Sequence, residues 1–196
     1  MPRPSLKDER SEQILDAYLT CVARFGLEGA TQQRIATEAG IKRPLLRHYL
    51  GNRDQMLTAL TAYVVDGFAV TTDALSEALT EDGTPRDLIE LLFDDATGND
   101  PRMMLAYQAL VTATGDHPEM RVPLLNSMTR FLAVIENVLT RAAPTATRAH
   151  IRAVTQGIAA SYVTLDAMSP LTPPAEWQSE MKQAAAMLAA SLESEQ

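Results

Sequence analysis

The sequence predicts an all-α protein of about nine helices, with a small N-terminal helix-turn-helix domain followed by a larger helical domain. Apolar residues recur three and four positions apart in long segments of the 196-residue chain. Ala and Leu are the commonest residues and only nine of the 196 residues are Gly, which favours helix. Residues 31–53 combine two short helical patterns with a glycine between them, the layout of a helix-turn-helix.

Composition indicates a soluble globular protein, and the length allows a small domain and a larger one; we place the boundary at the end of the helix-turn-helix segment, giving domains at 1–52 and 53–196. The chain is 46% hydrophobic and 21% charged. Its longest purely apolar run, 184–190, is far shorter than the roughly 20 residues of a membrane span. Residues 1–13 lack the apolar core of a signal peptide. The single Cys21 fits a reducing compartment, either as a buried thiol or as a redox sensor. We therefore expect a cytoplasmic protein without membrane association.

Charge is distributed unevenly along the chain. Residues 1–53 carry nine Lys or Arg and six Asp or Glu, a net charge of +3. The other 143 residues carry eight Lys or Arg and 19 Asp or Glu, a net charge of -11. This asymmetry predicts that only the N-terminal part approaches an anionic partner.

The first helix is expected over residues 8–24, after a loose, lightly basic arm at 2–7. Gly26 and Gly29 bracket the bend that follows it. The apolar residues of this helix recur at helical spacing and predict one buried face: Ile14, Tyr18, Val22 and Phe25.

The second and third helices are defined by a cap, a turn and a proline. Thr31 is a natural N-cap, and Ile35 points inward one turn later. Gly40 provides the turn, and the third helix begins near Arg43 or Pro44, where a proline costs little.

The third helix gathers positive charge in a chain that is otherwise acidic. No acidic residue lies between Ala39 and Arg53. In a major groove, Arg can bond guanine O6 and N7, and Gln can pair with adenine. A charged helix face is often simply solvated, but its place on a helix-turn-helix pattern favours DNA binding. The basic residues are Lys42, Arg43, Arg47, His48 and Arg53.

One set of residues with consistent spacing begins in the first helix and continues into the fourth: Ile14-Leu15-x-Ala17, Gly26, Thr31, Ile35-Ala36-x-x-Ala39-Gly40-Ile41, Pro44-x-Leu46-x-x-Tyr49-Leu50, Asn52-Arg53 and Leu57. This set resembles the N-terminal signature of the tetracycline-repressor (TetR) family of bacterial transcriptional regulators. The resemblance covers about 45 residues. It implies a three-helix DNA-binding domain, a larger helical ligand-binding domain, and a homodimer held by the last two long helices.

The resemblance also implies roles for individual residues. Positions that contact phosphate in the family are Thr31, Arg47, Tyr49 and Arg53. Positions that touch base edges are Gln33, Lys42, Arg43 and Pro44. With His48 from the basic cluster, these residues form the predicted DNA-binding set. The chain departs from the family at Lys42, Leu45 and Arg47, where a capping Ser or Thr, a small polar residue and an aromatic residue are usual, so Arg47 could instead read guanine.

Six further helices are expected downstream. Their ranges are 53–79, a fifth helix containing Leu88 and Leu92, a sixth from Pro101, a seventh from Pro118, an eighth over 147–168, and a ninth through Trp177 and Leu192. The acidic segment 94–100 lacks the alternating ligands and the terminal Glu of a calcium loop, so no metal site is predicted.

Met and aromatic residues at helical spacing usually belong to a core, but they can also line an adaptable apolar cavity. The residues expected to contact an effector are Phe68, Phe93, Met104, Tyr107, Met128, Phe131 and Tyr162. The eighth helix carries small residues that permit close approach of another helix, namely Ala153, Gly157, Ala160 and Ser161. With the apolar ninth helix, they predict a two-fold contact of four helices, or alternatively the monomer core.

The sequence contains no nucleophile elbow, glycine-rich phosphate loop or metal-ligand pair of the common enzymes, and no cofactor is expected. The predicted function is a ligand-responsive transcriptional repressor that is released from its operator by a small molecule. Its expected partners are a palindromic operator in double-stranded DNA, an effector of unknown identity, and a second copy of the chain. The alternative is a helical small-molecule-binding protein without specific DNA binding.

Overall fold

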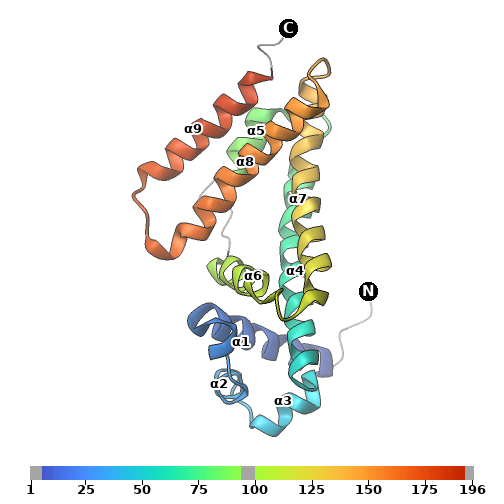
Figure 1. Cartoon of the computed structure of the whole chain (residues 1–196), viewed down its shortest axis with the longest axis vertical. Coiled ribbons are helices and arrows are strands. Elements are labelled where there is room, and N and C mark those ends of the chain that lie inside the picture. Colours follow the sequence, from blue (N-terminus) through green and yellow to red (C-terminus); the bar gives the residue numbers. More distant parts are fainter. Residues whose placement is uncertain (1–5, 94–99, 193–196) are drawn as a thin grey trace. The chain divides into compact units, whose positions relative to one another are not determined.

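The computed structural model describes residues 6–93 and 100–192, and within these ranges it contains nine α-helices and no strand (Figure 1). This confirms the predicted all-α class. The elements are α1 Leu6–Gly29, α2 Gln32–Glu38, α3 Arg43–Leu50, α4 Arg53–Ala78, α5 Pro85–Leu92, α6 Pro101–Ala113, the 3-10 turn η2 Pro118–Met120, α7 Arg121–Ala142, α8 Arg148–Met168, the 3-10 turn η3 Ser169–Leu171, and α9 Glu176–Ser191.

The chain forms two compact units that do not follow its order. Unit 1 comprises residues 1–68 and 102–126, and unit 2 comprises 69–101 and 127–196. The boundaries fall within α4, after the first residue of α6 and within α7, so unit 1 holds α1, α2 and α3 together with nearly all of α6. The predicted DNA-binding domain at 1–52 and ligand-binding domain at 53–196 are functional assignments, and they stay a prediction.

Unit 1 is built on an apolar core that includes the helix-turn-helix segment. Its fully buried side chains include Ile14, Leu19, Ile35, Leu46, Leu60 and Leu110. Phe68 and Tyr107 pack edge to face with ring centroids 5.4 Å apart, and the Tyr107 hydroxyl donates to the Leu124 carbonyl at 3.0 Å. The core thus joins α1, α2 and α3 to the first part of α4 and to α6.

Unit 2 packs α8 against α9 at close range. A Cβ added at Gly157 of α8 would lie 2.7 Å from Leu188 Cδ1 of α9, so the glycine permits this approach. Gly157 therefore serves a contact within one chain, whereas Ala153 and Ala160 remain exposed. The core of unit 2 includes Leu88, Ile135, Leu139, Ile158 and Ala185.

Most expected helix boundaries are confirmed, but three differ. Leu6 and Lys7 belong to α1 instead of an arm, while residues 1–5 lie outside the described residues. Pro118 begins a 3-10 turn, with α7 starting at Arg121. A proline fits the first turn of either kind of helix, and 3-10 turns are frequent at the starts of α-helices.

The third difference is at the end of α1, which continues beyond Arg24 to Gly29. Gly26 breaks the helix with φ 69° and ψ 173°, a conformation open to glycine. Helical turns resume after it, and the Ala30 N–H donates to the Gly26 carbonyl at 3.0 Å.

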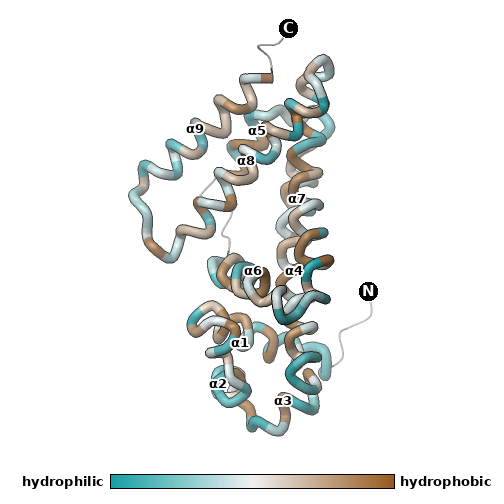
Figure 2. The backbone as a smooth tube through the Cα atoms, in the orientation of Figure 1, coloured by the Kyte–Doolittle hydropathy of each residue, from teal (hydrophilic) through white to brown (hydrophobic). Residues whose placement is uncertain are grey.

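Hydrophobic and hydrophilic residues are interleaved along the long helices (Figure 2). None of the described helices has the length and apolar character that a membrane crossing needs. Cys21 is buried, which fits the structural thiol, and burial raises its pKa. The acidic segment at 94–99 lies outside the described residues, and the described part of the chain contains no group of three His, Cys, Asp or Glu placed to hold a metal.

Candidate nucleic-acid interface

Helix α2 starts as the sequence predicts. Thr31 is its N-cap in an extended conformation, and the Thr31 hydroxyl accepts a hydrogen bond from the Arg34 backbone N–H at 3.3 Å. The cap satisfies one of the N–H groups that a helix start leaves without a partner. Ile35 and Ala36 are buried one turn later and fix α2 to the core of unit 1.

The turn between α2 and α3 depends on Gly40. Its φ of 62° lies in the left-handed region, and nothing lies within 4 Å of a Cβ added there. Glycine is therefore favoured by backbone conformation, not by lack of space. The Ile41 N–H donates to the Ala36 carbonyl at 2.9 Å, which closes the end of α2 and directs the chain into α3.

Helix α3 is held by two leucines and exposes its basic side. Leu46 and Leu50, one turn apart, are buried in the core of unit 1. Lys42 is the N-cap but makes no side-chain capping bond, which fits its departure from the usual Ser or Thr. Of the nine predicted DNA-binding residues, Tyr49 is half-buried and the others are exposed: Thr31, Gln33, Lys42, Arg43, Pro44, Arg47, His48 and Arg53.

Arg43, a predicted base-contacting residue, is held by α2. Its Nε and Nη2 donate to Oε1 of the Gln32 side chain at 3.3 and 3.2 Å. Nε2 of the same Gln32 side chain donates to Met56 Sδ at 3.9 Å. Gln32 therefore connects the start of α3 to α4 and restricts where the guanidinium group can lie.

Arg53, a predicted phosphate-contacting residue, is paired within the chain. Its Nη2 donates to both carboxylate oxygens of Glu28, at 3.0 and 3.1 Å. Both side chains are largely exposed, at 68% for Arg53 and 86% for Glu28. The pKa of nearby Tyr18 is raised to about 12, mainly by burial of its hydroxyl group. The positive charge of Arg53 opposes this rise in pKa, and the negative charge of Glu28 adds to it.

A reciprocal cap fixes the position of Arg53 at the start of α4. The Gln55 backbone N–H donates to Asn52 Oδ1 at 2.9 Å, and the Asn52 backbone N–H donates to Gln55 Oε1 at 2.9 Å. Such a pair satisfies two backbone donors at a helix start. The side chain of Arg53 therefore leaves from an ordered first turn.

The sequence-based prediction for Phe25 is wrong. It was expected on the buried face of the first helix, but it is 44% exposed. The helix breaks at Gly26, so Phe25 leaves that face. The guanidinium carbons of Arg34 and Arg24 lie 4.6 and 5.3 Å from the centroid of its ring. Arg34 also donates from Nη1 to the Gly29 carbonyl at 2.6 Å.

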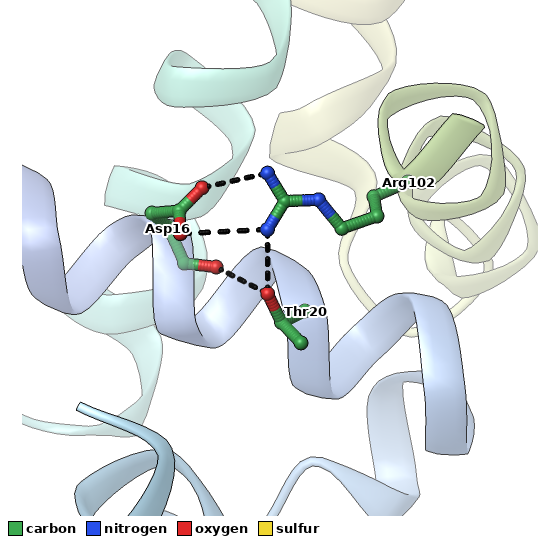
Figure 3. Close-up of polar contacts among 3 residues, drawn as sticks. All are labelled: Asp16, Thr20 and Arg102. Atoms are coloured by element: carbon green, nitrogen blue, oxygen red, sulfur yellow. Dashed lines mark hydrogen bonds and ion pairs between the residues drawn. The ribbon is translucent and has the colours of Figure 1, made fainter. Parts of the chain in front are cut away.

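Helix α6 is tied to α1 by a group of three side chains (Figure 3). Arg102 donates from Nη2 to Asp16 Oδ1 at 2.9 Å and from Nη1 to the Thr20 hydroxyl at 2.7 Å. Thr20 itself donates to the Asp16 carbonyl at 3.0 Å. A bidentate guanidinium contact of this kind fixes orientation as well as distance.

The seven predicted effector-contacting residues divide between the two units. Phe68, Met104 and Tyr107 belong to unit 1, and Phe93, Met128, Phe131 and Tyr162 belong to unit 2. In unit 2, the Tyr162 ring is 6.2 Å from Phe93 at an interplanar angle of 84°, and 5.6 Å from Phe131 at 42°. Phe93, Phe131 and Tyr162 therefore form one aromatic cluster.

Sequence reasoning did not identify two residues that contact the predicted DNA-binding arginines. Glu28 precedes Arg53 by 25 positions and Gln32 precedes Arg43 by 11. Each pair joins side chains of two different helices, so no local pattern indicates these contacts. The polar side chain of Gln32 at the start of α2 was the one feature of the sequence that could have indicated a contact with Arg43.

Comparison with known proteins identifies transcriptional regulators among the relatives of this chain. No protein-family model matches the chain. The chain is 30% identical over 162 residues to "HTH-type transcriptional regulator BetI" of Burkholderia mallei, covering 82% of this chain and 81% of that protein. It is 31% identical over 115 residues to "HTH-type transcriptional regulator BetI 2" of Chromohalobacter salexigens, covering 56% of this chain and about half of that protein, 55%.

Solved structures share the fold. A putative transcriptional regulator from Pseudomonas aeruginosa PAO1 superposes with a TM-score of 0.76 at 21% identity, covering 95% of this chain and 91% of that one. A putative TetR-family regulator from Rhodococcus sp. gives a TM-score of 0.72 at 21% identity, covering 92% and 99%. Similarity therefore extends over both units, beyond the helix-turn-helix segment.

Proposed function

Because this chain belongs to the TetR family of transcriptional regulators, whose members bind DNA and small-molecule effectors and act as dimers, we propose that it is a repressor released from a palindromic operator by a small molecule. The observation that carries the proposal is α3, which is anchored by Leu46 and Leu50 and exposes Arg43, Arg47 and His48. The proposed place of action is the cytoplasm, where the chromosome lies.

Helix α3 would enter a major groove with its N-terminal residues against the base edges. Arg43 suits this role because Gln32 restricts its guanidinium group before DNA arrives. A bidentate contact between Arg and guanine discriminates against other bases by about 1–3 kcal/mol. Thr31, Tyr49 and Arg53 would contact phosphates, which sets register and adds affinity without sequence preference.

The proposed dimer presents two copies of α3 to one duplex. In the single chain, α8 exposes Ala153 and Ala160, and α9 exposes Met187 at 68% and Trp177 at 43%. A two-fold contact through these helices would cover this apolar surface. The two half-sites would lie about one helical turn apart, roughly 34–36 Å, or a multiple of it.

The dimer would have two conformations that differ in the separation of its two α3 helices. The effector would act by binding one of these conformations more tightly than the other. A ligand shifts such an equilibrium only by its differential affinity for the two states. The seven aromatic and methionine residues predicted from sequence remain the proposed contacts. The four in unit 2 include the aromatic cluster around Tyr162.

Selection of binding sites from a randomised duplex pool tests the proposal. The purified chain should enrich an inverted repeat with half-sites spaced as stated, and binding should weaken steeply with salt because phosphate contacts release counterions. The alternative, a small-molecule-binding protein without specific DNA binding, predicts no enrichment. Enrichment of an isolated half-site would contradict the dimeric arrangement but not the role of α3.

A further inference from the structure

Gln32 connects three helices of unit 1. It is the first residue of α2 and is half-buried. Its Oε1 accepts hydrogen bonds from Arg43 at the start of α3, and its Nε2 donates to Met56 Sδ in α4, where Met56 is buried. A guanidinium group carries donors and no acceptor, so the amide oxygen faces Arg43 and the amide nitrogen faces the sulfur. Both ends of the Gln32 amide are therefore engaged within the chain.

The hydrogen bonds to Gln32 occupy one edge of the Arg43 guanidinium group. An arginine offers donors on a side edge, formed by Nε and Nη2, and on an end edge, formed by Nη1 and Nη2. Gln32 Oε1 lies 3.3 Å from Nε and 3.2 Å from Nη2, which is the side edge. Each terminal nitrogen carries a pair of hydrogens, so Nη2 keeps one N–H for the end edge beside those of Nη1. The end edge therefore keeps the parallel donors that guanine O6 and N7 accept.

The amide of Gln32 is already used in a way that opposes direct reading of a base. A glutamine that recognises adenine needs both its amide oxygen and its amide nitrogen, on N6 and N7. The oxygen of Gln32 bonds Arg43 and its nitrogen bonds Met56. The contribution of Gln32 to recognition therefore passes through Arg43.

A held Arg43 differs from a free one in what it can bind. The side chain of Arg43 is exposed, and a long exposed side chain loses rotamer freedom when it binds a base edge. With its side edge bonded to Gln32, Arg43 has lost part of that freedom before DNA binds. A base without the acceptor pair of guanine then leaves donors of the held end edge unsatisfied, which is costly. The hold by Gln32 therefore increases the preference for guanine.

We propose that Gln32 is a positioning residue that determines the base specificity of Arg43. It holds the side edge of the guanidinium group so that Arg43 presents the end edge to guanine, and Gln32 itself does not touch DNA. This inference rests on the proposed function, because it requires that α3 reads an operator. It goes further by assigning base preference to a residue of α2 that lies outside the predicted DNA-binding set.

The test measures preference at a single base pair by fluorescence anisotropy. The selected operator is compared with operators in which each G·C pair is replaced in turn by A·T, and the pair at which Arg43→Ala loses preference is the one that Arg43 reads. Gln32→Leu should lower this preference by about two- to tenfold, because Arg43 is no longer held. Gln32→Met, which is similar in length and also lacks the oxygen, should do the same. The preference is a ratio of two affinities of one variant, so a reduced folded fraction cancels.

Two further measurements separate positioning from a purely structural role. Gln32→Glu keeps an oxygen acceptor, so it should keep the preference of the wild type while its negative charge weakens binding to every duplex. In the Arg43→Ala background, Gln32→Leu should cause no further loss of preference, because the two residues act through one contact.

Gln13→Leu is the matched control. Gln13 Oε1 accepts a hydrogen bond from Arg10 Nη1 at 2.8 Å within α1, so this variant removes the same kind of contact outside the predicted DNA-binding set. Its preference at every base pair should equal that of the wild type.

Several results would overturn the positioning role. An unchanged preference in Gln32→Leu and Gln32→Met would do so, as would an equal loss in Gln32→Glu and Gln32→Leu. A loss that persists in the Arg43→Ala background would make Gln32 a direct base reader, and an Arg43→Ala variant with unaltered preference at every pair would leave Gln32 nothing to position. A wild type that selects no operator would contradict the proposed function itself, and this inference with it.

Discussion

At the scale of single residues, two arginines of the candidate interface already form contacts within the chain. Arg53 cannot bond a phosphate with the same nitrogen while that nitrogen donates to Glu28 at 3.0 and 3.1 Å. Arg43 likewise donates to Gln32. The two cases differ: Glu28 carries a negative charge that opposes DNA, whereas Gln32 is neutral and can position Arg43 without repelling the duplex.

The pair between Glu28 and Arg53 gives the first prediction. Glu28→Gln should tighten binding to operator and to random DNA by a similar factor, about two- to fivefold, because an exposed pair contributes about 0–1 kcal/mol. Fluorescence anisotropy with both duplexes measures it. Glu12→Gln, which removes an exposed charge from α1, is the control for net charge. Tighter binding to the operator alone would show that Glu28 affects base recognition instead.

Asp166 gives the second prediction. Because burial raises its folded-state pKa above the unfolded value, its contribution to stability is fully present below the unfolded pKa and is lost as pH rises through the folded pKa. Asp166→Asn avoids that loss. The variant should melt about 1–2 °C higher at pH 7, since water screens a half-exposed group, and the gain should vanish in acid. A lower melting temperature at pH 7 would indicate a favourable partner for this carboxylate.

At the scale of elements, the sequence predicts helices well where a cap, a turn residue or an apolar repeat is local. Thr31 caps α2 as expected, α8 begins at Arg148, one residue after its expected start, and Gly40 adopts the left-handed conformation that its place in the turn requires. Phe25 was misplaced because its helical spacing gives no sign of the break at Gly26. Local sequence patterns therefore predict where the helices lie, but they do not always predict which side chains are buried.

The turn between α2 and α3 gives the third prediction. Gly40→Ala should destabilise the protein by roughly 1–2 kcal/mol, the cost of a left-handed conformation for an L-residue, although nothing lies near the added carbon. Gly115→Ala is a matched control, since Gly115 also has open space but no positive φ, and it should change stability by about 0.5 kcal/mol or less. Thermal unfolding measures both, and equal effects would contradict the backbone explanation.

At the scale of the whole molecule, contacts between distant parts of the chain could not be predicted. Arg102 contacts Asp16, 86 residues earlier, and Gln178 contacts Phe93, 85 residues earlier. No periodicity relates such positions, because they are set by how helices pack. For the same reason the sequence indicated which residue types could line an effector site, but it did not show that Tyr162 lies against Phe93 and Phe131 while Phe68 lies against Tyr107.

The dimer gives the fourth prediction. Met187→Glu places a charge on an exposed apolar position of α9 and should shift sedimentation toward the single chain. Operator affinity should fall more than about tenfold, because two linked half-site contacts become separate. Ala133→Glu, at an exposed position of α7, should leave both properties unchanged. A dimeric Met187→Glu variant with full affinity would contradict an interface through α9.

The central claim is that α3 reads base sequence while its neighbours hold the DNA backbone. The most direct measurement is the affinity of wild type, Arg43→Ala and Arg53→Ala for the selected operator and for random DNA of equal length. Arg43→Ala should lose about 1–3 kcal/mol on the operator and little on random DNA. Arg53→Ala should lose a similar amount on both. Equal losses on both duplexes for Arg43→Ala, or a wild type without preference for the operator, would contradict the account.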